Sequence, residues 1–414
     1  MTTADRCYVF VQLPGTLEVV PCGRFRAEEK LGVVAGKFSY LSEYLARSDA
    51  VAIDPFELPL KKGTFTTTRL NGIFGALRDA SPDAWGRRVI EHVFRVNELS
   101  EVQYLLNSPE DRIGALSFSR DETSPAPVQR FNKTLQLAQL LSVAEKILDG
   151  VAPETIAQRT DLLSPGTSLG GARPKSVVED DTGLWVAKFP LRSDRWNSPV
   201  VEAAMLSLAG KAGLQVAEHR VERVGKRDVL LVKRFDRERT AGGYLRRRMV
   251  SGLTVLQAED AASDRLAWSY PRLADELGRW CRAPQEQRQE LFRRIVFNAL
   301  ISNSDDHPRN HALIAPSADW HLSPAYDLTP SPTVSQERRL AMQIGERGVS
   351  ATRANLLSAA RRFDLTREQA TTEIDRLKDF VLTHWERVVR EEGAVNADVA
   401  AIASAFDYPG FEYE

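Results

Sequence analysis

The sequence predicts a two-lobed α+β fold with a β-rich first part and a mainly helical last part. Strand-like stretches occur early in the chain and return between about residues 164 and 233, in the order strand, strand, helix, strand, strand. From about residue 246 the pattern is mostly helical, and its clearest helices are residues 285–302 and 367–392. A polar stretch, NSDDHPRNHA, lies near the start of the helical part. A β-rich segment followed by a helical one with such a stretch is the layout of a two-lobed enzyme.

The composition is that of an ordinary folded protein. With 414 residues the chain is long enough for two or three domains and a sizeable buried core. Its 55 basic and 56 acidic side chains give no overall reason to expect direct binding of nucleic acid. Three widely spaced cysteines without a CxxC pair argue against a disulfide framework or a zinc cluster. Because neither a signal peptide nor an apolar run of membrane-spanning length is evident, we expect a soluble, cytoplasmic protein.

The first part of the chain, residues 1–125, is expected to form a β-rich accessory subdomain. Its predicted strands fall within residues 6–21, 36–41 and 111–118. Between them, SPDAWGRRVIEHVFRV predicts a helix with Ser81 as its N-cap and Pro82 at its first position. The charged, Pro-rich residues 121–128 are the expected linker to the next part.

The second and third parts are expected at residues 126–245 and 246–414. The second begins with a predicted helix at residues 133–149. One face of this helix is apolar and consists of Leu135, Leu137, Leu140, Leu141 and Ile147. Residues 220–248 carry eleven Lys/Arg and four Asp/Glu, a net charge of +7. This basic segment is either a solvated face or a docking surface for an acidic partner or phosphate.

The stretch NSDDHPRNHA carries residues that could do chemistry. His307 and His311 stand four apart, as zinc ligands on one helix face do, but Pro308 between them disfavours a regular helix. The Glu of the HExxH pattern is also missing, so a zinc site is disfavoured. Asp305 and Asn310 instead have the Asp-x-x-x-x-Asn spacing of a phosphoryl-transfer loop. In such a loop the Asp accepts the proton of the attacking hydroxyl, and the Asn holds Mg²⁺.

A loop of this kind needs a second carboxylate for Mg²⁺, and Asp327 can supply it. This residue follows a short predicted strand, DWHL, within the stretch LSPAYDLTPS. One or two protein oxygens are enough, because waters and phosphates complete the coordination of Mg²⁺. The alternative is that Asp327 only starts a turn.

An upstream lysine is also needed, and Lys188 ends the predicted strand GLWVAKFP on its aliphatic face. The alternative is a strand-end lysine whose ammonium reaches water. A helix is expected to follow, with Ser198 as its N-cap and Pro199 as its first residue. Glu202, expected in the first turn of this helix, either pairs with Lys188 or complements the helix dipole.

Two further stretches have features suited to a nucleotide. SPGTSLGGARPKS offers backbone N–H groups at Gly170 and Gly171 and a positive charge at Lys175, although it matches neither a Walker A loop nor GxGxxG. DVLLVKRFDRE predicts a strand that runs into a polar turn and would suit a hinge between lobes. The backbone groups of residues 233–235 are expected to be exposed there and available to an adenine edge.

Together these motifs resemble the HipA family of toxin kinases from bacterial toxin–antitoxin modules. The motifs are, in chain order, SLGGARPK, WVAKFP, VKRFDR, ISNSDDHPRNHALI and LSPAYDLTPS. ASPDAWGRR and DRIGALSF resemble the family's accessory subdomain, so the resemblance covers nearly the whole chain. It implies a bilobal kinase-like fold related to lipid kinases, and phosphorylation of Ser or Thr that uses ATP and Mg²⁺.

The resemblance also implies a role for individual residues. Asp305 would be the catalytic base, Asn310 and Asp327 the Mg²⁺ ligands, and Lys188 a phosphate ligand. The implied ATP-binding residues are Gly170, Gly171, Ala172, Arg173, Pro174, Lys175, Lys188, Lys233, Arg234, Phe235, His307, Pro308, Arg309, Asn310, Tyr326 and Asp327. Ser168 matches the serine at which family members phosphorylate themselves, and a charge near −2 there would unseat an anion-binding loop. Otherwise Ser168 is only a small turn residue.

Partners and substrate are implied only by the family. Members bind a small DNA-binding antitoxin, so a HipB-like antitoxin, and DNA through it, are expected, and a membrane is not. Known targets of the family are aminoacyl-tRNA synthetases. Lys233 departs from the family, because this hinge position is often acidic there. Two alternatives stay open: a kinase of a lipid or small molecule, and a non-catalytic HipA-like scaffold that binds an antitoxin–DNA complex.

Overall fold

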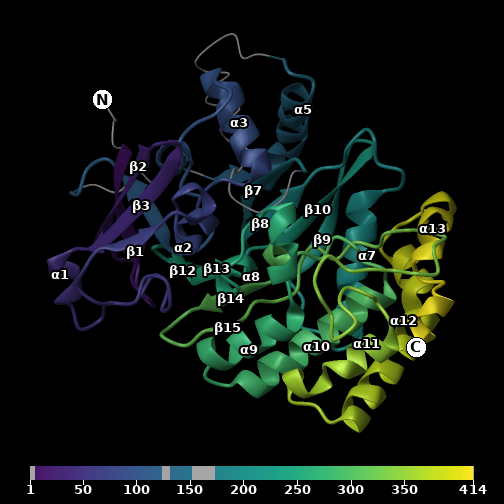
Figure 1. Ribbon diagram of the computed structural model, residues 1–414. Helices are drawn as coiled ribbons and strands as arrows, with labels where there is room; N and C mark the ends of the chain where they lie inside the picture. The colour runs from purple at the N-terminus through teal and green to yellow at the C-terminus, as the bar shows by residue number, and fades with distance from the viewer. Residues whose placement is uncertain (1–4, 124–130, 152–172, 414) are drawn as a thin grey trace. The chain divides into compact units, whose positions relative to one another are not determined.

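The computed structural model of the chain describes residues 5–123, 131–151 and 173–413 (Figure 1). Contacts group the chain into two compact units, each built from separated stretches. Unit 1 comprises Met1–Lys188, Arg234–Val250 and Ile314–Ala318, and unit 2 comprises Phe189–Lys233, Ser251–Leu313 and Asp319–Glu414. Among the described helices, none is both long enough and apolar enough to cross a bilayer.

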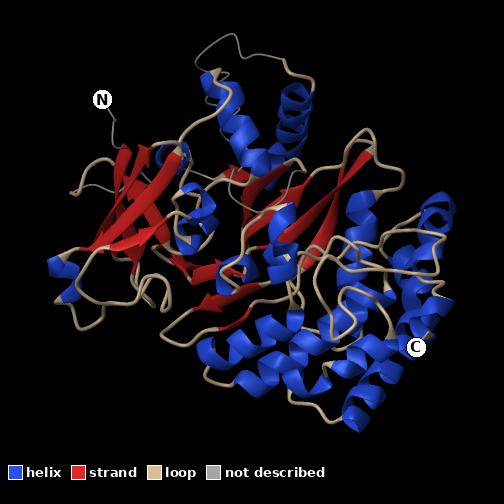
Figure 2. Cartoon of the chain, viewed as in Figure 1, coloured by secondary structure: helices blue, strands red, loops and turns tan. Residues whose placement is uncertain are grey.

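Unit 1 begins with a five-stranded antiparallel sheet in the order β4-β3-β2-β1-β5 (Figure 2). Its strands are β1 (Asp5–Gln12), β2 (Val19–Lys30), β3 (Val33–Tyr40), β4 (Phe65–Thr67) and β5 (Leu116–Ser119). Val9, Phe25 and Phe38 are completely buried in its core. The strands expected in this part of the chain are therefore confirmed. β2 extends further than predicted because its last residues pair with β3 in a long hairpin.

Four helices accompany this sheet: α1 (Ser42–Leu45), α2 (Gly75–Asp79), α3 (Ala84–Phe94) and α4 (Glu101–Asn107). The helix expected after Ser81 is α3, but the prediction of its N-cap was wrong. Asp83 caps α3, because its carboxylate accepts the backbone N–H of Gly86 at 2.7 Å. Ser81 is buried and lies before the helix.

The described residues in the rest of unit 1 form short strands and one long helix. They are β6 (Asn132–Lys133), α5 (Leu137–Leu148), β7 (Lys175–Asp180), β8 (Gly183–Lys188), β11 (Arg237–Thr240), β12 (Gly243–Arg246) and, at the boundary with unit 2, β13 (Arg248–Ser251). β7 pairs in parallel with β6 and antiparallel with β8. Leu135 was expected on the apolar face of α5 but is 95% exposed, because it lies in a 3-10 turn before the helix.

Unit 2 is mainly helical. Its elements are α7 (Ser198–Lys211), β9 (His219–Val224), β10 (Arg227–Lys233), α8 (Gly252–Val255), α9 (Tyr270–Trp280), α10 (Pro284–Leu300), β14 (Ala312–Ala315, which crosses into unit 1), β15 (His321–Leu322), α11 (Arg353–Ser358), α12 (Arg367–Glu391) and α13 (Asn396–Ile402). β9 and β10 form an antiparallel pair. α12 packs against α7 and α10, and α10 packs against α9. The two clearest predicted helices, α10 and α12, are confirmed.

The start of α7 differs from the prediction. Asn197 occupies the N-cap position, and Ser198 and Pro199 are the first two helical residues. Glu202 therefore lies beyond the first turn, which contains no acidic residue. It is only 5% exposed, so complementing the helix dipole at the surface is not its role.

Candidate active site

The stretch at residues 303–312 forms a loop directly after α10. Ser302 turns the chain with a left-handed φ of 57°, and the Asn303 N–H donates to the Asn298 carbonyl at 2.8 Å. A single 3-10 turn, Pro308–Asn310, follows, and β14 begins two residues later. Pro308 opens this turn, which agrees with the expectation that no regular helix passes through the stretch. We call residues 303–312 the polar loop.

The two neighbouring acids of the polar loop have opposite environments. Asp305 is exposed, whereas Asp306 is only 1% exposed. The Asp306 carboxylate accepts hydrogen bonds from three residues, namely the hydroxyl of Tyr270, Nδ2 of Asn298 at 2.7 Å and Nε2 of His311 at 3.0 Å. Burial disfavours the charged form, but attraction to His311 and the hydrogen bonds outweigh it and lower the pKa of Asp306.

The hydrogen bonds of the buried Asp306 therefore hold the polar loop in place, while the neighbouring Asp305 faces solvent. Asp306, Tyr270 and Asn298 were not predicted as site residues from the sequence. The pair of acids in NSDDHPRNHA was the only sequence signal that pointed to this network. His311 belongs to this Asp306 network. Within the described residues, no group of three or more His, Cys, Asp or Glu could hold a metal ion.

Two hydrogen bonds tie the predicted site residues of unit 2 together. Asn310 is 7% exposed, and its Nδ2 donates to the backbone carbonyl of Asp305 at 3.4 Å. The Tyr326 hydroxyl donates to the carbonyl of Arg309 at 2.7 Å, which joins the polar loop to the residue before Asp327. Asp305, Asn310 and Tyr326 are thus brought into one connected group.

Asp327 has an unusual backbone conformation. Its φ of 60° lies in the left-handed region, where a non-glycine residue is uncommon. Ala325, two residues earlier, is fixed by two backbone hydrogen bonds: its N–H donates to Gln215 O at 2.8 Å, and its carbonyl accepts from Ala217 N at 3.0 Å. Such strain is maintained by the surrounding structure and occurs frequently at functional positions. The half-buried Asp327 side chain supplies a hard oxygen donor beside Tyr326.

The remaining predicted residues of the polar loop differ in their surroundings. Pro308 is buried, and Arg309 forms an ion pair with Asp260 at 2.8 Å. His307 is half-buried, and its Nδ1 has no hydrogen-bond partner in the part of the chain that the structure describes. A buried polar atom without a partner is rare in proteins and is a candidate ligand contact.

The two residues predicted to form an ion pair near the phosphates lie in different units. Lys188 is the last residue of β8 in unit 1 and is half-buried. Glu202 is buried in α7 of unit 2. Their pairing stays a prediction.

The predicted phosphate loop is only partly within the described residues. Ser168, Gly170, Gly171 and Ala172 lie outside them, and Arg173 and Pro174 directly precede β7. Lys175 begins β7 and is 3% exposed. Its ammonium donates to Asp83 Oδ2 at 2.8 Å, and its carbonyl accepts from Nε1 of Trp85 at 3.1 Å. The charge of Lys175 is therefore engaged by the same residue that caps α3.

The expected hinge, residues 233–235, lies where the chain passes from unit 2 to unit 1. Its first two backbone N–H groups were expected to be exposed, but both are already bonded. The Lys233 N–H donates to Glu218 O at 2.7 Å, and the Arg234 N–H donates to Leu184 O at 2.8 Å. Lys233 also pairs with Glu218 through its ammonium at 2.7 Å.

The basic segment, residues 220–248, is not simply a solvated face or a docking surface. Arg234, Arg237 and Arg248 are 4%, 8% and 6% exposed. The first two form ion pairs with the buried Asp236. Three of the eleven basic side chains of this segment are thus buried, and the two alternatives of a solvated face and a docking surface stay open for the other eight.

Two family models match this chain. The HipA N-terminal domain matches residues 17–119, and the HipA-like C-terminal domain matches residues 167–385, more than half of the chain. The chain belongs to the HipA family. The second HipA domain contains every residue of the polar loop, together with Lys188, residues 233–235 and Asp327.

Individual relatives agree with this assignment. The Ser/Thr-protein kinase toxin HipA of Shewanella oneidensis is 28% identical over 206 residues, which span 44% of this chain and 47% of that protein, about half its length. A candidate kinase of Sinorhizobium fredii, named Y4mE, is 27% identical over 338 residues, or 75% of this chain and 76% of Y4mE. Relatives that carry kinase names support kinase activity in general.

A solved structure supports the fold. It is the complex of HipA, HipB and operator DNA from Shewanella oneidensis MR-1, and its chain matches with a TM-score of 0.65 at 16% identity. The match covers 97% of this chain and 95% of that one. The expected α+β, kinase-like fold is therefore confirmed.

Proposed function

We propose that this protein is an ATP-dependent serine/threonine protein kinase that acts as the toxin of a toxin–antitoxin module. The observation that carries the proposal is the connected group on the polar loop. An exposed acid, Asp305, is followed five residues later by the buried Asn310, whose amide bonds to the Asp305 backbone. The buried Asp306 anchors the loop through its hydrogen bonds to Asn298 and His311, so the Asp305 carboxylate stands on a fixed backbone.

The residues present are compatible with Mg²⁺ and ATP. The Asn310 amide and the Asp327 carboxylate are hard oxygen donors, and Mg²⁺ in phosphoryl-transfer sites commonly takes one or two such ligands from the protein. Nδ1 of His307, which has no hydrogen-bond partner among the described residues, offers a further polar contact. When bound, Mg²⁺ and ATP supply the transferable phosphoryl group and the neutralisation of its charge.

The residues of this chain then have the following roles in our proposal. Asp305 accepts the proton of the attacking Ser or Thr hydroxyl, and Asn310 and Asp327 hold the metal. Lys188 binds the phosphates, and Glu202 orients it. The residues that contact the nucleotide elsewhere are Gly170, Gly171, Ala172, Arg173, Pro174, Lys233, Arg234, Phe235, His307, Pro308, Arg309 and Tyr326. Lys175 is not one of these contacts in our proposal, because its ammonium is buried and paired with Asp83; it holds the start of β7 directly after the loop.

The proposed substrate and partners rest on the family assignment. We propose a protein substrate in the translation machinery, such as an aminoacyl-tRNA synthetase, and a cytoplasmic location. We also propose a HipB-like antitoxin as partner, with DNA bound through it, because the solved relative is a complex of HipA with HipB and operator DNA. Ser168 is the proposed site of autophosphorylation, where a phosphate would disturb an anion-binding loop.

Transfer of labelled phosphate from ATP to a serine-rich acceptor protein tests the proposed base. Asp305→Asn should lower the rate by about 10²–10⁴-fold, because a general base is lost, while ATP still binds. Asp319→Asn is the control, since Asp319 is an exposed acid that pairs with Arg282 outside the site. A rate for Asp305→Asn equal to that of the wild type would remove Asp305 from the mechanism.

A further inference from the structure

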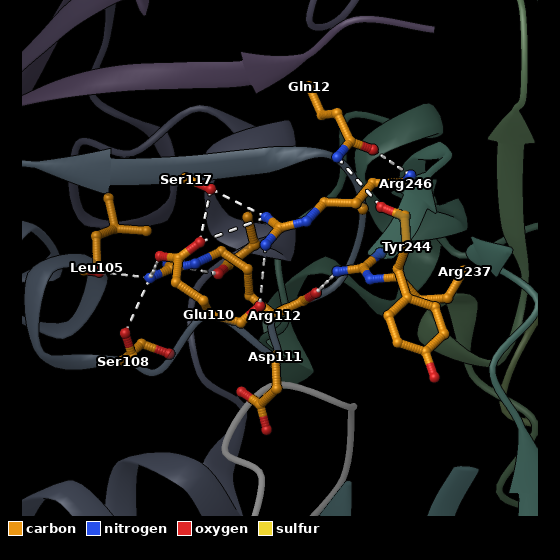
Figure 3. Close-up of polar contacts among 12 residues, drawn as sticks. Gln12, Leu105, Ser108, Glu110, Asp111, Arg112, Ser117, Arg237, Tyr244 and Arg246 are labelled. Carbon is orange, nitrogen blue, oxygen red and sulfur yellow. Dashed lines mark hydrogen bonds and ion pairs between the residues drawn. The ribbon is translucent and has the colours of Figure 1, made fainter. Parts of the chain in front are cut away.

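A network of buried charges joins two distant stretches of unit 1, and Figure 3 shows the part of it around Arg112, Arg237 and Arg246. One stretch follows α4, and the other follows β10 directly after the hinge. We call this set the arginine network; it consists of Glu110, Arg112, Arg234, Asp236, Arg237 and Arg246. All but Arg246 are at most 8% exposed, and Arg246 is half-buried. The two stretches belong to regions that the two HipA domain models match separately, residues 17–119 and 167–385.

Asp236 is the central acceptor of the network. It accepts from Arg234 Nε at 2.9 Å and Nη2 at 2.7 Å, and from Arg237 Nη1 at 2.7 Å. The backbone N–H of Gly114, in the other stretch, donates to the same carboxylate at 2.9 Å. Burial alone would raise the pKa of Asp236, but the two arginines hold it well below its usual range.

The two arginines also reach across to the other stretch directly. Nη2 of Arg234 and Nη2 of Arg237 donate to the same backbone carbonyl, that of Arg112, at 3.0 and 2.6 Å. Nη1 of Arg234 donates to the carbonyl of Asp111. The segment after the hinge is therefore held by hydrogen bonds to the backbone of residues 111–114.

Further contacts hold the acceptor side in place (Figure 3). The Arg112 guanidinium donates to the carbonyls of Leu105 and Ser108 at 3.2 and 2.9 Å and to Glu110 at 3.2 Å. Nη1 of Arg246 donates to Ser117 Oγ at 3.0 Å, and this hydroxyl donates to Glu110 at 2.6 Å. The network thus contacts β5, an edge strand of the first sheet, as well as the hairpin strand β12.

We propose that the arginine network positions the hinge, residues 233–235, for nucleotide binding, with Asp236 and Arg237 as positioning residues. Arg234 links the network to the hinge, because its backbone N–H donates to Leu184 O while its side chain is fixed in the network. The HipA N-terminal domain is then part of the support of the nucleotide site. The statement about the nucleotide rests on the proposed function, whereas the positioning of the hinge does not.

The test compares two carboxylates that stand two residues apart. Asp236→Asn removes the central buried charge, and Glu238→Gln removes an exposed one that pairs with Arg247 at 3.2 Å. Because buried arginines without their counter-charge destabilise a protein, Asp236→Asn can fail to fold. Arg237→Lys is the second variant: it keeps the charge but cannot donate to both Asp236 and the Arg112 carbonyl as the guanidinium fork does.

Hydrogen exchange of the nucleotide-free protein tests the positioning itself. In Asp236→Asn and Arg237→Lys, the amides of Lys233 and Arg234 should exchange about tenfold faster, with exchange in α12 unchanged. Glu238→Gln should exchange as the wild type does. Equal acceleration in α12 would indicate general destabilisation, and unchanged exchange at residues 233–235 would overturn the proposal.

Steady-state kinetics test the consequence for the nucleotide. KM for ATP should rise about tenfold in the same variants, with kcat within about twofold of wild type. Inhibition by inorganic tripolyphosphate, which lacks the adenine, should be unchanged. An unchanged KM for ATP together with faster hinge exchange would overturn the link to the nucleotide. If the wild-type protein binds no ATP, the proposed function fails, and the exchange data still decide whether the network positions the hinge.

Discussion

Asp54, in unit 1, gives the protein a pH dependence that arises from a single buried carboxyl group. It is 1% exposed, and its Oδ1 accepts the backbone N–H groups of Phe56 and Glu57 at 2.7 and 3.0 Å. Its Oδ2 has no partner among the described residues. Burial raises the pKa of Asp54 to about 7. The folded state therefore binds this proton more tightly than the unfolded state, and the contribution of Asp54 to stability declines as the pH rises from about 4 to 7.

Asp54→Asn should remove this decline. The Asn carbonyl oxygen can accept the same two N–H groups, so the variant should gain stability relative to wild type between pH 4.5 and 8, by at most ~4 kcal/mol. Thermal unfolding at both pH values measures the gain. Asp49→Asn, at an exposed acid, is the control. A difference between variant and wild type that is the same at both pH values would show that Asp54 is not the titrating group.

Tyr270 tests whether the buried Asp306 supports the proposed base beside it. Tyr270→Phe removes one donor from Asp306 and should lower kcat several-fold with little change in KM for ATP, because the polar loop is held less firmly. The free energy of unfolding should fall by about 1–3 kcal/mol, the usual penalty for an unsatisfied buried acceptor. The control is Tyr413→Phe at an exposed tyrosine. Lower stability with an unchanged kcat would mean that Asp306 only stabilises the fold.

At this scale the sequence was informative about spacing and uninformative about distant partners. Asp305 and Asn310 could be selected because five residues separate them within one loop. The role of Asp306 could not be foreseen, since Tyr270 lies 36 residues away and Asn298 eight residues away. Only the folded chain shows that these side chains meet.

Among the elements, α3 and β7 share one carboxylate. Asp83 Oδ1 caps α3 through Gly86, and Asp83 Oδ2 forms the ion pair with Lys175 at the start of β7. Both side chains of the pair are almost completely buried, at 3% and 8% exposure. The cap and the ion pair can therefore be separated by substitution.

Asp83→Asn should keep the cap of α3 and lose the ion pair, at a cost of about 3–5 kcal/mol in unfolding free energy. Asp83→Ala should cost about 1 kcal/mol more, because the cap is lost as well. Lys175→Met in the Asp83→Asn background should recover part of the loss, because no uncompensated buried ammonium is left. Denaturant unfolding measures all variants. Strictly additive effects of Asp83→Asn and Lys175→Met on the free energy of unfolding would show that the ion pair contributes nothing.

Long periodic elements were predicted well, and helix starts were not. The helices α10 and α12 and the strands β7 to β10 lie where the apolar patterns placed them. The N-cap of α3 lies two residues after the expected Ser81, and that of α7 one residue before the expected Ser198. Both starts contain a Ser-Pro pair beside a second capping residue, and local sequence does not decide between adjacent candidates.

For the whole molecule, the units are assembled from stretches that are far apart in the sequence. Residues 234–250 belong to the same unit as residues 1–188, although 45 residues of the other unit, Phe189–Lys233, separate them. The net charge of +7 over residues 220–248 looked like a surface property, but Arg234 and Arg237 are buried together with Asp236, the acid that pairs with both of them. A charge count along the chain does not report burial, so the arginine network could not be predicted from the sequence.

Phosphate transfer to the protein itself is the most direct test of the proposed kinase. Phosphatase-treated protein is incubated with Mg²⁺ and ATP, and its intact mass and phosphopeptides are measured beside those of Asp305→Ala. We predict that the wild type gains phosphate on Ser168, which lies outside the described residues, and that Asp305→Ala binds ATP without gaining any. A wild-type protein that carries no phosphate before phosphatase treatment, gains none afterwards and binds no ATP would contradict the kinase assignment.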